Sequence, residues 1–108
     1  MPSRLGSATL ARRIGVRIRA LRQEAKVTQE RLAWDCDLDK GYLSQVEAGK
    51  RVPSVPVLVA IARRLRLEPA DLLCFPGSRP RLRLLEAARK GDRKGVEDAL
   101  RQLACSRG

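Results

Sequence analysis

Residues 28–49, TQERLAWDCDLDKGYLSQVEAG, constrain the fold of this chain most, because they predict two short helices joined by a very tight turn. Thr28 supplies a hydroxyl N-cap for the first helix. The inward stripe of this helix is formed by three small or aliphatic residues, Leu32, Ala33 and Cys36. Asp37 tolerates a left-handed backbone, and Asp39 can cap the next helix. The angle between the two helices is therefore set by the turn itself.

The second of these helices is expected from Lys40 to about Ala48, where Gly49 supplies a left-handed stop. Its apolar face carries Leu43 and Val46. The other face carries small and polar side chains, so a partner's backbone can come close to the helix. The longer side chains of Lys40 and Gln45 can reach base edges. Glutamine pairs bidentately with adenine, and lysine donates to guanine. The residues predicted to read bases are Lys40, Gly41, Ser44 and Gln45.

Several short motifs follow one another in a fixed order between about residues 10 and 74. They are TQxxLA from Thr28, a tyrosine in the second helix, ExGxRxPS from Glu47 and LxxIAxxL from Leu58. In these motifs the chain resembles the Cro/lambda-repressor (XRE-type) helix-turn-helix family. The resemblance implies an all-α fold with a five-helix lambda-repressor-like DNA-binding domain. The residues after it, which the resemblance does not cover, predict a C-terminal helical hairpin.

The resemblance also implies phosphate contacts around the reading helix by Gln29, Tyr42, Lys50 and Arg51, and Arg22, on the basic face of the first helix, is a further candidate. Two of these have a second interpretation. Gln29 lies at a helix N-terminus, which favours an anion, or it only joins the first-turn hydrogen bonds. Arg22 reaches a phosphate, or it belongs to a solvated basic face. Glu47 is more often an internal partner in the family.

Charge is distributed unevenly along the chain. The net charge is +11, which makes a polyanion the expected partner. Residues 1–27 carry +6 and residues 78–108 carry +5, whereas residues 28–51 carry −1. Asp37 and Asp39 replace the family's usual glycine and serine, and they put carboxylates beside Lys40. Electrostatic attraction to DNA must therefore come from the flanks.

Composition argues against several other classes of protein. The chain has no histidine and three widely spaced cysteines, so we expect neither a metal site nor a disulfide framework nor catalytic residues. No cofactor is expected. No apolar run is long enough to cross a bilayer and no signal sequence is recognisable, so we expect a cytoplasmic protein without membrane contact.

The predicted domain boundaries follow the helix signals. They are a flexible arm at 1–9, the DNA-binding domain at 10–76, a linker at 77–80 and the hairpin at 81–105. The first helix is expected from about Thr9 to Ala25, and the residues expected on its buried face are Leu10, Ile14, Ile18, Leu21 and Ala25. Ser54 caps the fourth helix, Pro69 opens a short fifth, and Gly91 with Asp92 forms the turn of the hairpin.

Four apolar residues are predicted to contact a partner, Trp34, Leu85, Leu100 and Leu103. A two-helix hairpin cannot bury both of its faces alone, so this one either packs on its own domain or pairs with its symmetry mate. Trp34 is expected on an exposed helix face, where the C-terminal segment covers it, a second subunit covers it, or nothing does.

The function indicated by these features is sequence-specific binding of double-stranded DNA by a transcriptional regulator. We expect a repressor that binds a palindromic operator as a homodimer. Two alternatives remain open, an antitoxin-type regulator that also binds a protein toxin, and a protein-interaction module on the same fold.

Overall fold

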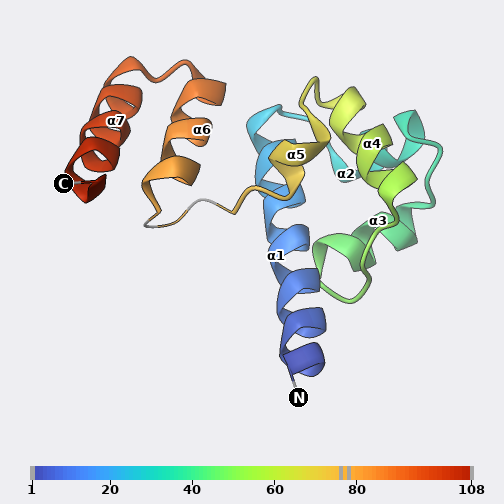
Figure 1. The fold of residues 1–108 in the computed structure, drawn as a ribbon. Coiled ribbons are helices and arrows are strands. Elements are labelled where there is room, and N and C mark those ends of the chain that lie inside the picture. Colours follow the sequence, from blue (N-terminus) through green and yellow to red (C-terminus); the bar gives the residue numbers. More distant parts are fainter. Residues whose placement is uncertain (1, 76, 78, 108) are drawn as a thin grey trace. The chain divides into compact units, whose positions relative to one another are not determined.

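The computed structural model describes residues 2–75, 77 and 79–107, and every regular element among them is a helix (Figure 1). The helices are α1 (Pro2–Glu24), α2 (Gln29–Asp35), α3 (Lys40–Glu47), α4 (Val55–Arg64), α5 (Pro69–Leu72), α6 (Pro80–Lys90) and α7 (Arg93–Arg107). The chain divides into two compact units, Met1–Leu73 and Cys74–Gly108. The all-α fold class is confirmed.

The first unit is a five-helix domain with an aliphatic core. Helix α1 contacts α3 and α5, α2 contacts α3 and α4, and α4 contacts α5. The largest fully buried side chains are Ile18, Leu32, Leu43, Ile61, Leu72 and Val46. Each helix gives the core one or two such residues, so every helix depends on its neighbours for burial of its apolar stripe.

Local capping signals position the helices. The Thr28 hydroxyl accepts a hydrogen bond from the Arg31 amide at 3.0 Å, and the Ser54 hydroxyl accepts one from the Val57 amide at 3.4 Å. Asp37 has φ 56° in the turn before α3. Asp39 occupies the N-cap position of α3, but its side chain makes no cap hydrogen bond.

Residues with a left-handed backbone follow four of the five helices of this domain, α1, α2, α3 and α4. Gly49 has φ 78° after α3, as predicted, and the Lys50 amide donates to the Gln45 carbonyl at 2.9 Å. Lys26 and Arg66 adopt the same conformation after α1 and α4, with φ 61° and 60°. Neither stop is a glycine, so no residue type marks these two helix ends in the sequence.

The N-terminal part of α1 differs from the prediction. A flexible arm at 1–9 was expected, but α1 begins at Pro2, and Met1 lies outside the described residues. Proline suits the first turn of a helix, and no second proline interrupts residues 3–24. The buried stripe also differs, because Ala11 is buried whereas Leu10 is 42% exposed and Ala25 is exposed.

The second unit is a helical hairpin formed by α6 and α7. Gly91 turns the chain with φ 72°, and the Asp92 carboxylate accepts a hydrogen bond from the Gly95 amide at 3.0 Å. A Cβ at Gly95 would lie 3.0 Å from the Ala87 Cβ, so the helices approach closely through small residues. Ala87 and Ala99 are buried here. Ala88, the next residue of α6, is exposed.

Candidate nucleic-acid interface

Helix α3 has two faces with different tasks. Leu43 and Val46 are fully buried in the domain core. The four residues predicted to read bases, Lys40, Gly41, Ser44 and Gln45, are all exposed. The structure therefore brings the predicted reading set together on one solvent-facing side of a single helix.

Gly15 of α1 fixes the position of the C-terminal end of α3. A Cβ at this position would lie 2.4 Å from the Val46 carbonyl oxygen and 2.7 Å from the Glu47 carbonyl oxygen. Both atoms belong to backbone, which cannot move aside as a flexible side chain would. Only glycine lets α1 and α3 approach this closely, and the approach presents the outer face of α3 to solvent.

Glu47 joins three helices through its carboxylate. Its Oε2 accepts a hydrogen bond from Arg22 Nε of α1 at 2.7 Å, and its Oε1 accepts one from Arg22 Nη2 at 3.0 Å. Oε1 also accepts a hydrogen bond from Gln29 Nε2 at 3.0 Å, at the start of α2. The Glu47 side chain is 4% exposed, so this is a buried, bidentate charge pair.

The assignment of Arg22 to a DNA phosphate was wrong. Its Nη1 donates to the Val27 carbonyl at 2.8 Å while Nε and Nη2 hold Glu47, and the residue is 9% exposed. Arg17 is likewise buried, and its Nε donates to the Asp71 carbonyl at 2.8 Å. Two cations of the predicted basic face of α1 therefore hold the domain together.

Sequence reasoning missed these partners because they are distant along the chain. Arg22 and Glu47 are 25 residues apart, and Arg17 and Asp71 are 54 residues apart. No helical spacing links such positions. The one available signal was Glu47 itself, an acidic residue that the family resemblance assigned to an internal ion pair.

Gln29 has a structural role in this conformation. Its amide nitrogen donates to the Glu47 carboxylate of α3, and the residue is half-buried. The first-turn hydrogen bond of α2 comes from Thr28 instead. Contact of Gln29 with a phosphate stays a prediction.

Lys40 lies at the first turn of α3 beside an acidic partner. Its Nζ is 3.0 Å from Glu30 Oε1, and both side chains are well exposed, at 58% and 74%. An exposed pair of this kind contributes at most about 1 kcal/mol, so DNA phosphates or bases can displace it. The acidic neighbour of Lys40 is thus Glu30 of α2, in addition to the aspartates of the turn.

A second cluster lies at the other end of α3. Arg51 Nε donates to Gln45 Oε1 at 2.8 Å, and the Arg51 guanidinium carbon lies 5.8 Å from the centre of the Tyr42 ring. Tyr42 is half-buried, while Gln45, Lys50 and Arg51 are exposed. The predicted phosphate contacts Tyr42, Lys50 and Arg51 therefore border the reading face.

Helices α2 and α4 are linked by an ion pair near the same domain's surface. Asp35 accepts hydrogen bonds from Arg64 and, at 3.2 Å, from Arg31 Nε. The Arg64 hydrogen bond is the main cause that lowers the pKa of Asp35 from 3.8, followed by burial, which opposes it, and by the charge of Arg31. Burial and the adjacent Asp35 raise the pKa of the Cys36 thiol from 9.0, so a reactive thiolate is disfavoured there.

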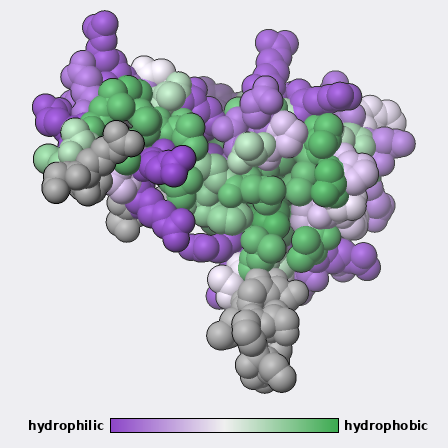
Figure 2. Space-filling model, in the orientation of Figure 1, coloured by the Kyte–Doolittle hydropathy of each residue, from purple (hydrophilic) through white to green (hydrophobic). Residues whose placement is uncertain are grey.

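The predicted partner residues are largely exposed on their own units. Trp34 is 79% exposed on α2, Leu85 is 58% exposed on α6 and Leu100 is 50% exposed on α7, while Leu103 is half-buried. Hydrophobic residues gather on the visible face of the hairpin in Figure 2. A hollow of about 460 Å³ on this unit is lined by Pro80, Leu82, Leu85, Leu103, Arg79 and Arg81. Which surface covers these residues stays a prediction.

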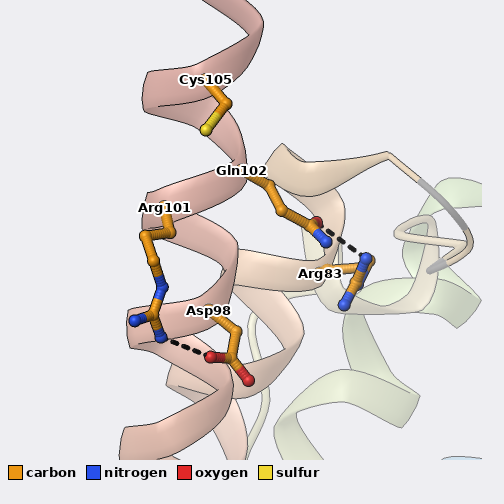
Figure 3. A pocket seen from close by; sticks show the side chains of 5 residues that line it. All are labelled: Arg83, Asp98, Arg101, Gln102 and Cys105. Atoms are coloured by element: carbon orange, nitrogen blue, oxygen red, sulfur yellow. Dashed lines mark hydrogen bonds and ion pairs between the residues drawn. The ribbon is translucent and has the colours of Figure 1, made fainter.

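A larger hollow on the hairpin, of about 610 Å³, is lined by Cys105 and by four polar residues that pair with one another (Figure 3). Arg83 Nη1 donates to Gln102 Oε1 at 2.8 Å and links α6 to α7, and Arg101 forms an ion pair with Asp98 at 2.6 Å. Among the described residues, no group of three potential metal ligands occurs, and no helix could span a membrane.

Comparison with known proteins defines the family. A family model described as a helix-turn-helix domain matches residues 13–73, which include α2, α3 and the turn between them. This match covers more than half of the chain. The chain therefore belongs to the helix-turn-helix family.

Individual relatives share this region. The chain is 37% identical over 62 residues to the control protein C.BamHI of Bacillus amyloliquefaciens, which covers 56% of this chain and 76% of that protein. It is 38% identical over 60 residues to an immunity repressor protein of Bacillus phage phi105, covering 56% of this chain but only 42% of the repressor. The similarity to these two relatives thus spans little more than half of the chain.

Two solved structures resemble the fold. The restriction-modification controller protein C.AhdI of Aeromonas hydrophila aligns with a TM-score of 0.56 and 35% identity, over 57% of this chain and 94% of that protein. The clp gene regulator ClgR of Corynebacterium glutamicum aligns with a TM-score of 0.58 and 26% identity, over 87% of this chain and 88% of that one. The second alignment covers more of this chain than the helix-turn-helix region.

Proposed function

We propose that this DNA-binding transcriptional regulator acts as a repressor, and that it binds a palindromic operator as a homodimer in the cytoplasm. The observation that carries the proposal is the outer face of α3. It presents Gly41, Ser44 and Gln45 to solvent on a helix whose opposite side is held by the core and by Glu47.

The surroundings of α3 suit a duplex. Gly41 has almost nothing beside its Cα, since an added Cβ would meet only the Asp39 carboxylate, at 3.2 Å. A base pair or a phosphate could therefore approach the backbone closely. Lys40 at one end of α3, and Lys50 and Arg51 after the other, supply cations at the groove edges, and Gln29 and Tyr42 complete the proposed phosphate contacts.

The relatives support regulation as the outcome of DNA binding. Their names describe a control protein, an immunity repressor, a controller protein and a gene regulator. We propose the hairpin, with its exposed Leu85 and Leu100, as a dimer contact. Two-fold symmetry would place two α3 helices in successive major grooves, about 34 Å apart.

Selection from a random library of duplexes at near-physiological salt tests the proposal. We expect an enriched inverted repeat whose half-site centres lie about one helical turn apart. If the protein binds duplexes at low salt but enriches no motif at near-physiological salt, the proposal is contradicted. Such a result would mean that only non-specific charge attraction, which salt weakens strongly, holds the DNA. Ser44→Asp adds a charge to the reading face and should abolish the enrichment. Arg63→Ser, which also lowers the charge by one unit and lies at an exposed position of α4, is the control.

A second candidate function is suggested by Trp34. Trp34 is 79% exposed and so presents a large apolar group to solvent on the surface of α2. Such a side chain suits the binding of a protein partner such as a toxin. Co-purification of a stable partner with the natural chain, and loss of that partner in Trp34→Ala with unchanged DNA selection, would favour this function.

A further inference from the structure

The Gln45 side chain on the outer face of α3 is held by a neighbouring residue. Its side-chain oxygen accepts a hydrogen bond from Arg51 Nε at 2.8 Å, and the Arg51 guanidinium lies over the Tyr42 ring, with 5.8 Å between the guanidinium carbon and the ring centre. The backbone favours this arrangement. The left-handed Gly49 folds the chain back so that Lys50 N–H donates to the Gln45 carbonyl, which brings Arg51 beside the residue that it holds.

The chemistry of arginine decides which end of the Gln45 amide faces it. A guanidinium has five N–H donors and no acceptor, so the amide atom facing it must be the oxygen. The Gln45 NH2 group is then the part left for a base. Tyr42 restricts the guanidinium from its other side, because a cation is attracted to the face of an aromatic ring.

We propose that Arg51 sets the base preference of Gln45 and makes it a reader of guanine. This inference rests on the proposed function. The bidentate pairing of glutamine with adenine needs the amide oxygen to accept from the adenine amino group while the NH2 donates to N7. With its oxygen turned toward Arg51, Gln45 presents the two donors of its NH2 group to the base. Guanine presents two adjacent acceptors in the major groove, N7 and O6, which match a donor-only group.

The charge of Arg51 acts in the same direction. A carboxamide oxygen can accept two hydrogen bonds, but an adenine amino group on its second lone pair would bring a further donor beside a guanidinium cation. Guanine O6 and N7 are instead attracted by that cation. The prediction from the sequence that glutamine reads adenine is therefore replaced, at this position, by a reading of guanine.

The decisive experiment compares duplex selections for the natural chain and three variants, Gln45→Ala, Arg51→Met and Lys50→Met. Gln45→Ala locates the base pair read by Gln45, since that position alone loses its preference. We expect this position to be G·C in the natural selection. In Arg51→Met the same position should shift toward A·T by about tenfold or more, because the freed amide regains bidentate pairing.

Lys50→Met is the matched control, because it removes the neighbouring positive charge and keeps the main-chain amide that donates to the Gln45 carbonyl. It should weaken binding at every site and leave the G·C preference unchanged. An A·T pair at the Gln45 position of the natural chain, or no shift in Arg51→Met, would overturn the inference. If the natural chain selects no motif at all, the proposed function has failed.

A measurement without DNA tests the pair itself. In nitrogen-15 NMR spectra of the free protein, the Arg51 Nε–H signal should show nuclear Overhauser contacts to the Gln45 side chain. The signal should exchange faster with water in Gln45→Ala. Absence of these contacts would also overturn the inference, whether or not the protein binds an operator.

Discussion

At the scale of single residues, Glu47 is the group on which the orientation of α3 depends. Its carboxylate accepts hydrogen bonds from α1 and α2 while it is almost fully buried. Removing one partner of a buried ion pair leaves an uncompensated charge, which is more damaging than the pair is stabilising. Mutations of Arg22 and Glu47 should therefore act on folding before they act on DNA.

We expect Arg22→Ala to lower the free energy of unfolding by about 3–5 kcal/mol, because the Glu47 carboxylate would stay buried without its cation. Urea denaturation followed by circular dichroism measures this loss. Lys50→Ala removes one positive charge from an exposed side chain and should leave the unfolding midpoint nearly unchanged. If Arg22→Ala kept full stability and only reduced the salt dependence of DNA binding, the buried role of Arg22 would be refuted.

Gly15 provides a second test at this scale. Its Cβ in Gly15→Ala would meet two backbone carbonyl oxygens at 2.4 and 2.7 Å, so α1 and α3 would have to separate. We expect a destabilisation of about 1–3 kcal/mol, visible as a lower thermal midpoint. Gly41→Ala should cause no comparable loss, since its Cβ would meet only an exposed carboxylate. Equal midpoints for the two variants would show that α1 can move away freely.

Which residues could be predicted from the sequence depended on how local their environment is. Exposure of Lys40, Gly41, Ser44 and Gln45 followed from the period of one helix. Burial of Arg17 and Arg22 did not, because it depends on acceptors that only the folded chain brings near. The bond between Arg51 and Gln45 also went unnoticed, although the two residues are only six apart, since it requires the chain reversal at Gly49.

At the scale of elements, the ion pair of Asp35 with Arg64 ties α2 to α4. The hydrogen bond from Arg64 is the main cause of the lowered Asp35 pKa, so the carboxylate is favoured in the folded state. Its contribution to stability is therefore present above the unfolded pKa, near 3.8, and is lost as pH falls through the lower pKa of the folded state.

We expect Asp35→Asn to unfold at a lower urea concentration than the natural chain at neutral pH. The difference should shrink as the pH is lowered below about 3.8, where the natural carboxyl also becomes protonated. Urea titrations at neutral pH and at about pH 2 measure it. Asp98→Asn, which alters an exposed pair on the hairpin, is the control. A difference that is the same at both pH values would contradict a role for the lowered pKa.

Helix ends were predicted well where a single side chain determines them. Thr28 and Ser54 cap α2 and α4, and Gly49 and Gly91 end α3 and α6, as their types indicated. The predicted start of α1, at about Thr9, was wrong, because a polar segment at a terminus carries no strong signal for or against a helix. The stops at Lys26 and Arg66 escaped detection because neither residue type favours a left-handed backbone.

At the scale of the whole molecule, the proposed assembly depends on the exposed leucines of the hairpin. Leu100→Glu should weaken the homodimer by about tenfold or more, since a carboxylate would have to be desolvated in the contact. Sedimentation equilibrium measures the change. Gln102→Glu places the same charge elsewhere on α7, where it can still accept the hydrogen bond from Arg83, and should leave assembly unchanged. An undiminished dimer in Leu100→Glu would exclude this surface as the contact.

The separation of the two faces of α3 has a consequence for how such a regulator can change. Leu43, Val46 and Glu47 are buried and maintain the fold, whereas Gly41, Ser44 and Gln45 face solvent, with the Gln45 side chain bound by the exposed Arg51. Substitutions on the outward side can accumulate one at a time, because each variant along the way still folds. A lineage could thus acquire a new operator by successive single changes, each of them retaining a stable protein.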